Sequence, residues 1–172
     1  AGQIANSIGC ETVAIVSSDE KLEWCKELGY SYGINYKKTA NLSSEIQTTC
    51  PNGVDVYFDN TGGPINDAVM ENLNINARIA VCGVIALADR IGKPDIGPRY
   101  WRQILVNRAK ITGFLVFDFV EEFKKAENYI WNLVEKGNFK FKEHTSYGIN
   151  TMASAFLDLL HSRNFGKRLI KI

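Results

Sequence analysis

Short runs of consecutive apolar residues alternate along this chain with longer segments in which apolar residues recur every three or four positions. Continuous apolar runs are typical of parallel strands buried on both faces, and the longer period is typical of helices with one buried face. Thr12 to Val16 is the first such run, and Ser17 or Ser18 then caps a helix that ends at Gly29. Alternating strands and helices predict right-handed crossovers and a parallel sheet, so we expect an α/β fold.

The same unit repeats through the middle of the chain. Val54 to Asp59 has the pattern of a buried strand, and Pro64 opens a helix whose apolar face carries Ile65, Ala68, Val69 and Leu73. The other expected elements are strands at Ile34–Tyr36, Arg78–Cys82 and Ile111–Phe117, and helices at Leu42–Ile46, Tyr100–Val106 and Val120–Glu135.

The pattern differs at both ends of the chain and in one long connection. Gly2 to Ile8 reads as the tail of a helix closed by Gly9, so we expect the chain to be a fragment of a longer protein. Val84 to Arg99 has no period and predicts a long loop. After residue 138, an alternating segment, a helix and the terminal strand Arg168–Ile172 read less like sheet core. We therefore predict one domain over residues 1–138 and a segment over residues 139–172 that packs on another domain.

Composition and charge narrow the possible functions. The 172 residues include 20 basic and 19 acidic side chains, and a net charge of +1 gives no general attraction to nucleic acid or membranes. No apolar run approaches the roughly 20 residues that a membrane span needs, and the amino terminus has no signal-peptide pattern. The cysteines and histidines lack the spacing of metal or redox motifs. We therefore expect no metal, no nucleic-acid or membrane partner, and a cytoplasmic location.

One strand ends in residues that suit a cofactor site. The Val54–Asp59 strand stops at Asn60-Thr61-Gly62-Gly63, and ligands of doubly wound sheets bind outside the carboxyl ends of the strands. Glycine tolerates positive φ and lets the backbone approach a ligand closely. Cys82-Gly83-Val84 follows the next strand, where a small residue would let a nicotinamide ring approach. Asparagine and two glycines after a strand are equally compatible with a simple turn.

A second strand end favours a phosphorylated cofactor. Ser18 and Lys21 stand where NAD-binding proteins place an acidic residue on the adenosine ribose, and hydroxyl and ammonium donors suit a 2′-phosphate. Asp19 and Glu20 argue against this interpretation, and Ser-Asp-Glu-Lys is also an ordinary helix start. Tyr36, at a further strand end, can stack on adenine or donate to a phosphate, or it can be a half-buried aromatic residue.

Together these motifs resemble the zinc-independent medium-chain dehydrogenase/reductases, and within them the group that contains leukotriene B4 12-hydroxydehydrogenase, also called prostaglandin reductase or alkenal double-bond reductase. The resemblance covers essentially the whole chain. It rests on these segments in order: Gly2-Gln3-Ile4-Ala5, Ser18-Asp19-Glu20-Lys21, Ile34-Asn35-Tyr36-Lys37, Val54 to Gly63, Ala77-Arg78-Ile79 with Cys82-Gly83, Gly97-Pro98-Arg99, Gly113-Phe114-Leu115-Val116 and Asn164-Phe165-Gly166-Lys167.

The resemblance implies a Rossmann-type doubly wound sheet that binds NADP without zinc. The implied reaction is NADPH-dependent reduction of the carbon–carbon double bond of an α,β-unsaturated aldehyde or ketone. Hydride goes to the β-carbon, and the enolate that results is protonated at the α-carbon. The implied partners are a small enal or enone substrate and, at full length, a second copy in a homodimer. The implied cofactor contacts are Lys21 and Tyr36 at the adenosine phosphate, Asn60, Cys82, Gly83 and Val84 near the nicotinamide, and Phe114, Leu115, Val116 and Asn164 closing over the cofactor.

The sequence departs from the family pattern in two respects. Ala88 stands where the family often has a tyrosine proposed to help the enolate, so no catalytic residue is assigned, and Tyr100 is only a distant substitute. The first strand, its glycine-rich turn and the N-terminal catalytic domain precede the matching region, so we expect this chain alone to be inactive. A non-catalytic nucleotide-binding or dimerisation module and an S-adenosylmethionine-dependent methyltransferase remain as alternatives.

Overall fold

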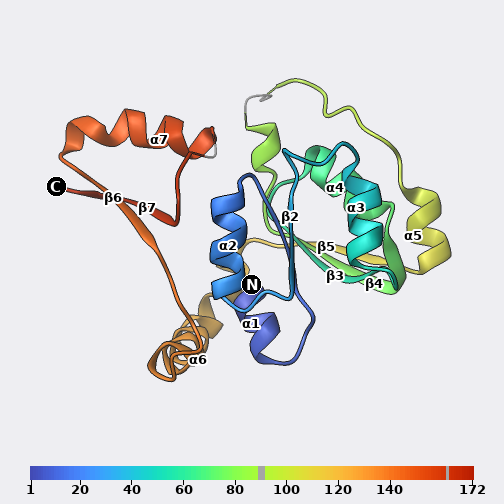
Figure 1. The fold of residues 1–172 in the computed structure, drawn as a ribbon, viewed down its shortest axis with the longest axis horizontal. Helices are drawn as coiled ribbons and strands as arrows, with labels where there is room; N and C mark the ends of the chain where they lie inside the picture. Colours follow the sequence, from blue (N-terminus) through green and yellow to red (C-terminus); the bar gives the residue numbers. More distant parts are fainter. Residues whose placement is uncertain (89–91, 162) are drawn as a thin grey trace.

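A computed structural model describes residues 1–88, 92–161 and 163–172 of the chain. Strands and helices alternate over most of its length (Figure 1), which confirms the predicted α/β class. The strands are β1 (Val13–Val16), β2 (Tyr32–Asn35), β3 (Val54–Asp59), β4 (Leu73–Val81), β5 (Lys110–Gly113), β6 (Glu143–Tyr147) and β7 (Lys167–Lys171). The helices are α1 (Gly2–Ser7), α2 (Asp19–Glu27), α3 (Leu42–Thr49), α4 (Gly63–Met70), α5 (Trp101–Asn107), α6 (Phe123–Glu135) and α7 (Met152–Leu160).

The strands pair in parallel in three small sheets. One sheet has the order β1-β2, a second has the order β3-β4-β5, and the third joins β6 to β7. Val16 lies opposite Asn35 at the carboxyl ends of the first pair. Asp59 lies opposite Val81, and Val81 lies opposite Gly113, at the carboxyl ends of the second sheet. The residues that follow these ends therefore share sheet edges, as a ligand crevice requires.

Helices α3 and α4 pack the first two sheets into one core. The buried cluster contains Ile34 from β2, Ile46 from α3, Val69 from α4 and Ile79 from β4. Asn72, just after α4, donates from Nδ2 to the carbonyl oxygen of Ser43 at 3.1 Å and so links the two helices. The remaining buried members of the cluster are Ala68, Met70, Leu73 and Ala77.

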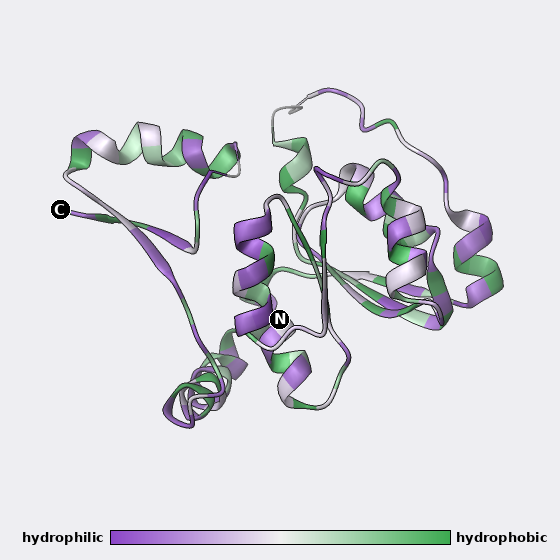
Figure 2. Ribbon diagram, viewed as in Figure 1, coloured by the Kyte–Doolittle hydropathy of each residue, from purple (hydrophilic) through white to green (hydrophobic). Residues whose placement is uncertain are grey.

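The opposite face of β3 is not covered by this core. Val56 and Phe58 are exposed there, although both belong to the predicted buried strand. Helix α6 also has no buried residue. Hydrophobic and hydrophilic residues lie side by side along α6 and α7 (Figure 2), so both helices have apolar faces that remain open to solvent in the described part of the chain. None of the described helices is long and apolar enough to cross a membrane.

Strands β6 and β7 and helix α7 form a carboxyl-terminal unit that lies to one side of the other strands (Figure 1). Helix α7 lies beside the β6-β7 pair. Several contacts join it to the rest of the chain, among them the following. Gln3 donates to the Lys140 carbonyl oxygen at 2.9 Å and accepts from the Lys140 backbone N–H at 2.8 Å. The ring of Phe165 meets the ring of Trp24 edge-on, with centroids 6.5 Å apart.

Two predicted boundaries differ from the structure in the middle of the chain. Leu73 begins β4 instead of ending the preceding helix, and β4 therefore starts five positions before the predicted Arg78. Helix α4 stops at Met70, and Asn72 Nδ2 donates to the Ala68 carbonyl oxygen at 2.8 Å, which satisfies a carbonyl group at this end of the helix. Asn76, with φ of 61°, interrupts the apolar run of β4, which is why the pattern concealed its first half.

The segment after β5 also differs. The strand ends at Gly113 instead of the predicted Phe117, and Val116–Glu122 forms a 3₁₀ helix before α6 begins at Phe123. The Asp118 carboxylate accepts from the Leu115 backbone N–H at 2.9 Å and turns the chain out of the strand direction. The predicted loop Val84–Arg99 contains a short 3₁₀ helix, Ile85–Leu87, and its residues 89–91 lie outside the described part.

Candidate functional site

The Asp59 side chain organises the polar exit of β3. It is almost fully buried, and its Oδ1 accepts from the Tyr57 hydroxyl at 2.9 Å, the Thr61 backbone N–H at 2.9 Å and the Gly62 backbone N–H at 2.8 Å. Its Oδ2 accepts from Asn66 Nδ2 at 3.0 Å. A buried carboxylate is stable only when such donors surround it. Asp59 therefore shapes the turn that presents Asn60.

Burial raises the pKa of the Tyr57 hydroxyl, and the negative charge of Asp59 and the hydrogen bond to it raise this pKa further. Tyr57 therefore remains a donor to Asp59 at neutral pH. Gly62 and Gly63 have φ of 68° and 57°, the positive values that the sequence predicted for this turn.

Backbone hydrogen bonds join the exits of β3 and β4. The Asp59 carbonyl oxygen accepts from the N–H of Cys82 at 2.7 Å and of Gly83 at 3.2 Å, and Ala86 N–H donates to the Thr61 carbonyl oxygen at 2.9 Å. A Cβ on Gly83 would lie 2.7 Å from Asn60 Oδ1, a distance that real Cβ atoms do not reach. Glycine is therefore needed at position 83 for Asn60 to occupy its place.

A cavity of about 400 Å³ lies at these joined exits. Four of the predicted cofactor residues line it: Asn60, Gly83, Val84 and Asn164. Ile85 and Leu159, which the sequence did not single out, complete its apolar wall. None of these six described lining residues is ionisable at neutral pH. The pocket combines two amide side chains with apolar surface, which suits an uncharged planar group, and Cys82 lies exposed beside it in the chain.

The predicted phosphate contacts meet at the other sheet. Ser18 caps α2, and its Oγ accepts from the Lys21 backbone N–H at 3.3 Å. The Lys21 ammonium group donates to Ser17 Oγ at 3.3 Å. Tyr36 follows β2 directly, and its backbone N–H donates to the Val16 carbonyl oxygen at 3.0 Å. Two serine hydroxyl groups, the Lys21 ammonium group and Tyr36 thus lie at one corner, and Ser17 belongs to it together with Ser18.

Partial burial lowers the pKa of Lys21, and the positive charge of Lys37 lowers it further, while Glu20 acts in the opposite direction. Positive charge therefore accumulates at this corner. Such a corner attracts a phosphate group.

Besides Cys82, three predicted residues belong to neither group. Phe114 packs on Phe58 and Phe119, with ring centroids 6.4 and 6.0 Å apart. Leu115 and Val116 are exposed and lead into the 3₁₀ helix. Among the described residues, these three are not part of the cavity wall that contains Asn60. Their role as cofactor contacts stays a prediction.

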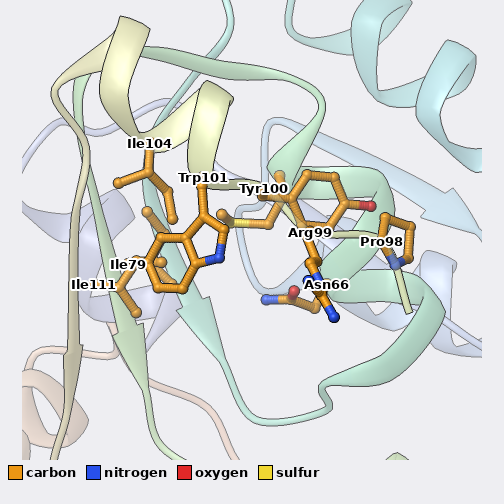
Figure 3. Close-up of a pocket in the computed structure, with 9 residues that line it drawn as sticks. Asn66, Ile79, Pro98, Arg99, Tyr100, Trp101, Ile104 and Ile111 are labelled. Atoms are coloured by element: carbon orange, nitrogen blue, oxygen red, sulfur yellow. The ribbon is translucent and has the colours of Figure 1, made fainter. Parts of the chain in front are cut away.

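Tyr100 lies in a different cavity, of about 350 Å³, between α5 and the sheet (Figure 3). Ile79, Trp101 and Ile104 line the same cavity, and none of the predicted cofactor residues lines it. The Tyr100 hydroxyl is buried without a hydrogen-bond partner among the described residues. Burial, followed by the charges of Asp67 and Glu71, raises its pKa to about 12. The structure thus gives no support to Tyr100 as a substitute proton donor beside Asn60.

Among the residues that the structure describes, no group of three or more histidine, cysteine, aspartate and glutamate side chains could hold a metal ion. Ile85, Leu159 and the hydrogen-bonding role of Asn66 were not predicted from the sequence. Apolar residues in a loop or helix carry no signal that separates a pocket wall from a core position, and Asn66 lies on an otherwise ordinary helix.

Comparisons with known proteins return dehydrogenases and reductases. The family profile described as zinc-binding dehydrogenase matches residues 1–132. The chain is 39% identical to the putative NADP-dependent oxidoreductase YfmJ of Bacillus subtilis (strain 168), covering 99% of the chain and 51% of that protein. It is 34% identical to prostaglandin reductase 1 of Rattus norvegicus (99% and 52% covered) and 30% identical to the NADP(+)-dependent 2-alkenal reductase of Nicotiana tabacum (99% and 50% covered).

The fold has a close counterpart among solved structures. The crystal structure of CurA from Vibrio vulnificus in complex with NADPH matches with a TM-score of 0.90 at 33% identity, covering 99% of this chain and 52% of CurA. This match confirms the predicted Rossmann-type sheet, and the relatives confirm the predicted resemblance. The chain spans about half the length of the relatives it matches. The relatives named here are oxidoreductases and lend no support to the methyltransferase alternative.

We expect Asp59→Asn to destabilise the protein by about 1–3 kcal/mol, the usual cost of leaving a buried donor unpaired. An amide oxygen at the Oδ1 position keeps three donors, but the amide nitrogen then faces the Asn66 donor. Asp55→Asn is the matched control, because Asp55 lies on the same strand and makes an exposed hydrogen bond to Asn74. The control should change the urea unfolding free energy by less than about 0.5 kcal/mol. Equal effects of both substitutions would contradict the proposed importance of the buried network.

We expect Tyr100→Phe to leave stability at neutral pH unchanged or slightly higher, since it removes a buried hydroxyl without a partner. In the wild type, Tyr100 holds its proton to about pH 12 when folded but ionises near pH 10 when unfolded. The contribution of the protonated Tyr100 to the free energy of unfolding is therefore fully present below pH 10 and is lost as the pH rises towards 12. The variant should lose less stability over this range in denaturation series at pH 9, 10 and 11. Identical alkaline slopes for the two proteins would rule this out.

Proposed function

We propose, because this chain belongs to the zinc-binding dehydrogenase family and within it to the zinc-independent medium-chain dehydrogenase/reductases, that it is the cofactor-binding part of an NADPH-dependent reductase. Its substrates are α,β-unsaturated aldehydes or ketones, whose carbon–carbon double bond is reduced. The main support is the uncharged cavity formed by Asn60, Gly83, Val84 and Asn164, together with the lysine-bearing corner at the adjacent sheet.

The choice of NADPH rests on the corner formed by Ser17, Ser18, Lys21 and Tyr36. Donors to a 2′-phosphate are present there, and Lys21 is held towards the hydroxyl of Ser17. The names of YfmJ and the tobacco 2-alkenal reductase state NADP dependence, and CurA was solved with NADPH. The substrate class follows the tobacco reductase and rat prostaglandin reductase by analogy.

In the proposed reaction, NADPH supplies a hydride to the β-carbon of the substrate, and a proton then adds to the α-carbon. The chain's own contribution is orientation. Asn60 and Asn164 offer amide groups that can fix the nicotinamide carboxamide, and Val84, Ile85 and Leu159 exclude water from the ring. Ala88 carries no proton donor, and the described cavity wall holds no acid, so the substrate proton has a source outside this wall.

We further propose that residues 1–138 form the nucleotide-binding domain and that residues 139–172 return towards a catalytic domain. Sheet β1-β2 and sheet β3-β4-β5 are not paired with each other among the described strands. One further parallel strand between them, followed by a glycine-rich turn, would join the sheets and supply the pyrophosphate contacts. Among the described strands β3 pairs only with β4, so its other edge is the one at which such a strand would add.

The four cysteines of the chain are all free. This usage fits the cytoplasm, where thiols stay reduced.

A homodimer is the proposed assembly of the full-length protein. Strand β5 ends the order β3-β4-β5, so one of its edges has no partner among the described strands. Its four residues are exposed, and the exposed Leu115 and Phe117 follow it. We expect twice the monomer mass by light scattering. Phe117→Asp, at a side chain 76% exposed, should produce monomers, whereas the control Ile8→Asp, at 69%, should not. A monomeric wild type would overturn this assembly.

The cofactor proposal predicts that the full-length protein oxidises NADPH with enals or enones and binds NADH more weakly. Lys21→Ala should weaken NADPH binding about tenfold to a hundredfold, the value of one charge-assisted hydrogen bond, and leave NADH binding unchanged. Lys26→Ala, on the opposite end of α2, is the control and should change neither. Dissociation constants and turnover with enals, enones and quinones are the measurements.

Equal or tighter binding of NADH by the wild type would refute the cofactor preference. Cofactor binding without turnover of any of these substrates would instead favour the alternative of a non-catalytic nucleotide-binding module.

A further inference from the structure

A carboxylate stands beside the lysine-bearing corner and works against a phosphate. Asp19 is the first residue of α2, directly after the cap Ser18 and two positions before Lys21. An acidic group at this corner of a Rossmann sheet hydrogen-bonds the ribose 2′-hydroxyl of NAD and repels the 2′-phosphate of NADP. A preference for NADPH therefore requires that the charge of Asp19 be neutralised or held away.

Both oxygens of Asp19 are engaged by the turn that follows β2. Oδ1 accepts from Asn35 Nδ2 at 2.7 Å, and Oδ2 forms an ion pair with the ammonium group of Lys38. The hydrogen bond from Lys38, and then that from Asn35, lower the pKa of Asp19. Asp19 thus stays ionised at neutral pH, but its charge is balanced by Lys38, and its oxygens point to the turn.

Asn35 also fixes the turn itself. Its side-chain Oδ1 accepts from the Lys37 backbone N–H at 3.1 Å, and its carbonyl oxygen accepts from the Lys38 backbone N–H at 3.0 Å. The turn therefore carries Tyr36, Lys37 and Lys38 in set positions, with Lys38 directed to Asp19.

Lys37 is the second cation of this corner. Its positive charge lowers the pKa of Lys21, after the larger effect of burial, and Glu20 raises that pKa. This corner carries three lysines (Lys21, Lys37 and Lys38) and two acidic residues (Asp19 and Glu20), so its net charge is positive. A 2′-phosphate, which carries close to two negative charges, matches this excess.

We propose that Asn35 and Lys38 clamp the Asp19 carboxylate, and that this clamp, with Lys37 as a second phosphate-binding cation beside Lys21, sets selectivity for a 2′-phosphorylated dinucleotide over its unphosphorylated form. The proposal rests on the cofactor preference proposed above. Asp19, Asn35 and Lys38 act as positioning residues that need not touch the cofactor, whereas Lys37 contacts the phosphate.

The first test is Lys38→Met in the full-length protein, with dissociation constants measured for NADPH and NADH. The substitution leaves the Asp19 carboxylate uncompensated, so the ratio of the NADH constant to the NADPH constant should fall about five- to tenfold, through weaker NADPH binding. Lys26→Met is the matched control. Lys26 and Lys38 are both 68% exposed and both ion-paired, but Lys26 pairs with Glu23 away from the corner, so its loss should leave the ratio unchanged.

The double variant Asp19→Asn/Lys38→Met separates the clamp from a general loss of positive charge. It removes both charges of the pair, so its net charge equals that of the wild type, and its ratio should return to within about twofold of the wild-type value. Lys37→Met should weaken NADPH binding about tenfold with NADH binding unchanged. Thermal melting of each variant, together with its retained NADH affinity, shows that it is folded.

The outcomes distinguish the two proposals. A wild-type preference for NADPH that survives Lys38→Met, or a double variant as unselective as Lys38→Met, would overturn the clamp and leave the cofactor proposal standing. Unchanged NADPH binding by Lys37→Met would overturn the role of that residue. A wild-type protein without preference for NADPH would overturn both proposals.

Discussion

The buried carboxylate of Asp59 is the constraint on which the candidate site depends. Its Oδ1 accepts hydrogen bonds from a side chain of β3 and from backbone N–H groups of the turn after it. Its backbone carbonyl oxygen accepts from the N–H groups of Cys82 and Gly83. One residue thereby fixes the exits of two strands relative to each other. Since a carboxylate freed of these donors would be buried at a high cost, the turn cannot relax without opening the end of the sheet. The position of Asn60 follows from this network more than from its own contacts.

The two groups of candidate residues differ in electrostatic character in a way that matches one kind of ligand. The corner after β1 and β2 carries Lys21, Lys37 and Lys38, whereas the described lining of the cavity after β3 and β4 consists of amide and apolar groups. A dinucleotide with a phosphorylated ribose at one end and an uncharged carboxamide ring at the other has the same division. Neither group of residues alone would separate a cofactor site from a helix cap or a turn. Their arrangement along adjoining strand ends gives the interpretation its weight.

Much of this architecture could be predicted from the sequence, because buried parallel strands and amphipathic helices have distinct periods. The bounds of strand β3, its glycine turn and the Ser18 cap appeared as expected, whereas Val56 and Phe58 of the predicted buried strand are exposed. The prediction was wrong where a side chain overrode the period. Asn72 ended α4 early, and Asp118 turned the chain after β5. The ion pair of Asp19 could not be predicted from the sequence either. Its partners Asn35 and Lys38 come from the end of β2 and the turn after it, which only the folded chain brings close to Asp19.

The motif Asn164-Phe165-Gly166-Lys167 shows how the carboxyl-terminal unit takes part in the site. Asn164 lines the cavity and donates to the Gly166 carbonyl oxygen at 3.0 Å, and the Lys167 backbone N–H donates to the Lys142 carbonyl oxygen at 2.7 Å. Gly166 has φ of 89° and lies against the Lys142 backbone, so a side chain there would be both strained and obstructed.

Phe165 connects this motif to the lysine-bearing helix. Its ring packs edge-on against Trp24 of α2, and the Lys142 ammonium group lies 3.7 Å from its centroid. The residue next to Asn164 is thus anchored on the helix that carries Lys21. The same short motif thus contributes Asn164 to the cavity wall and packs Phe165 on α2. It therefore connects the uncharged cavity to the helix that carries Lys21. Movement of α2 would shift Asn164, and a cofactor that spans both ends would hold the carboxyl-terminal unit in place.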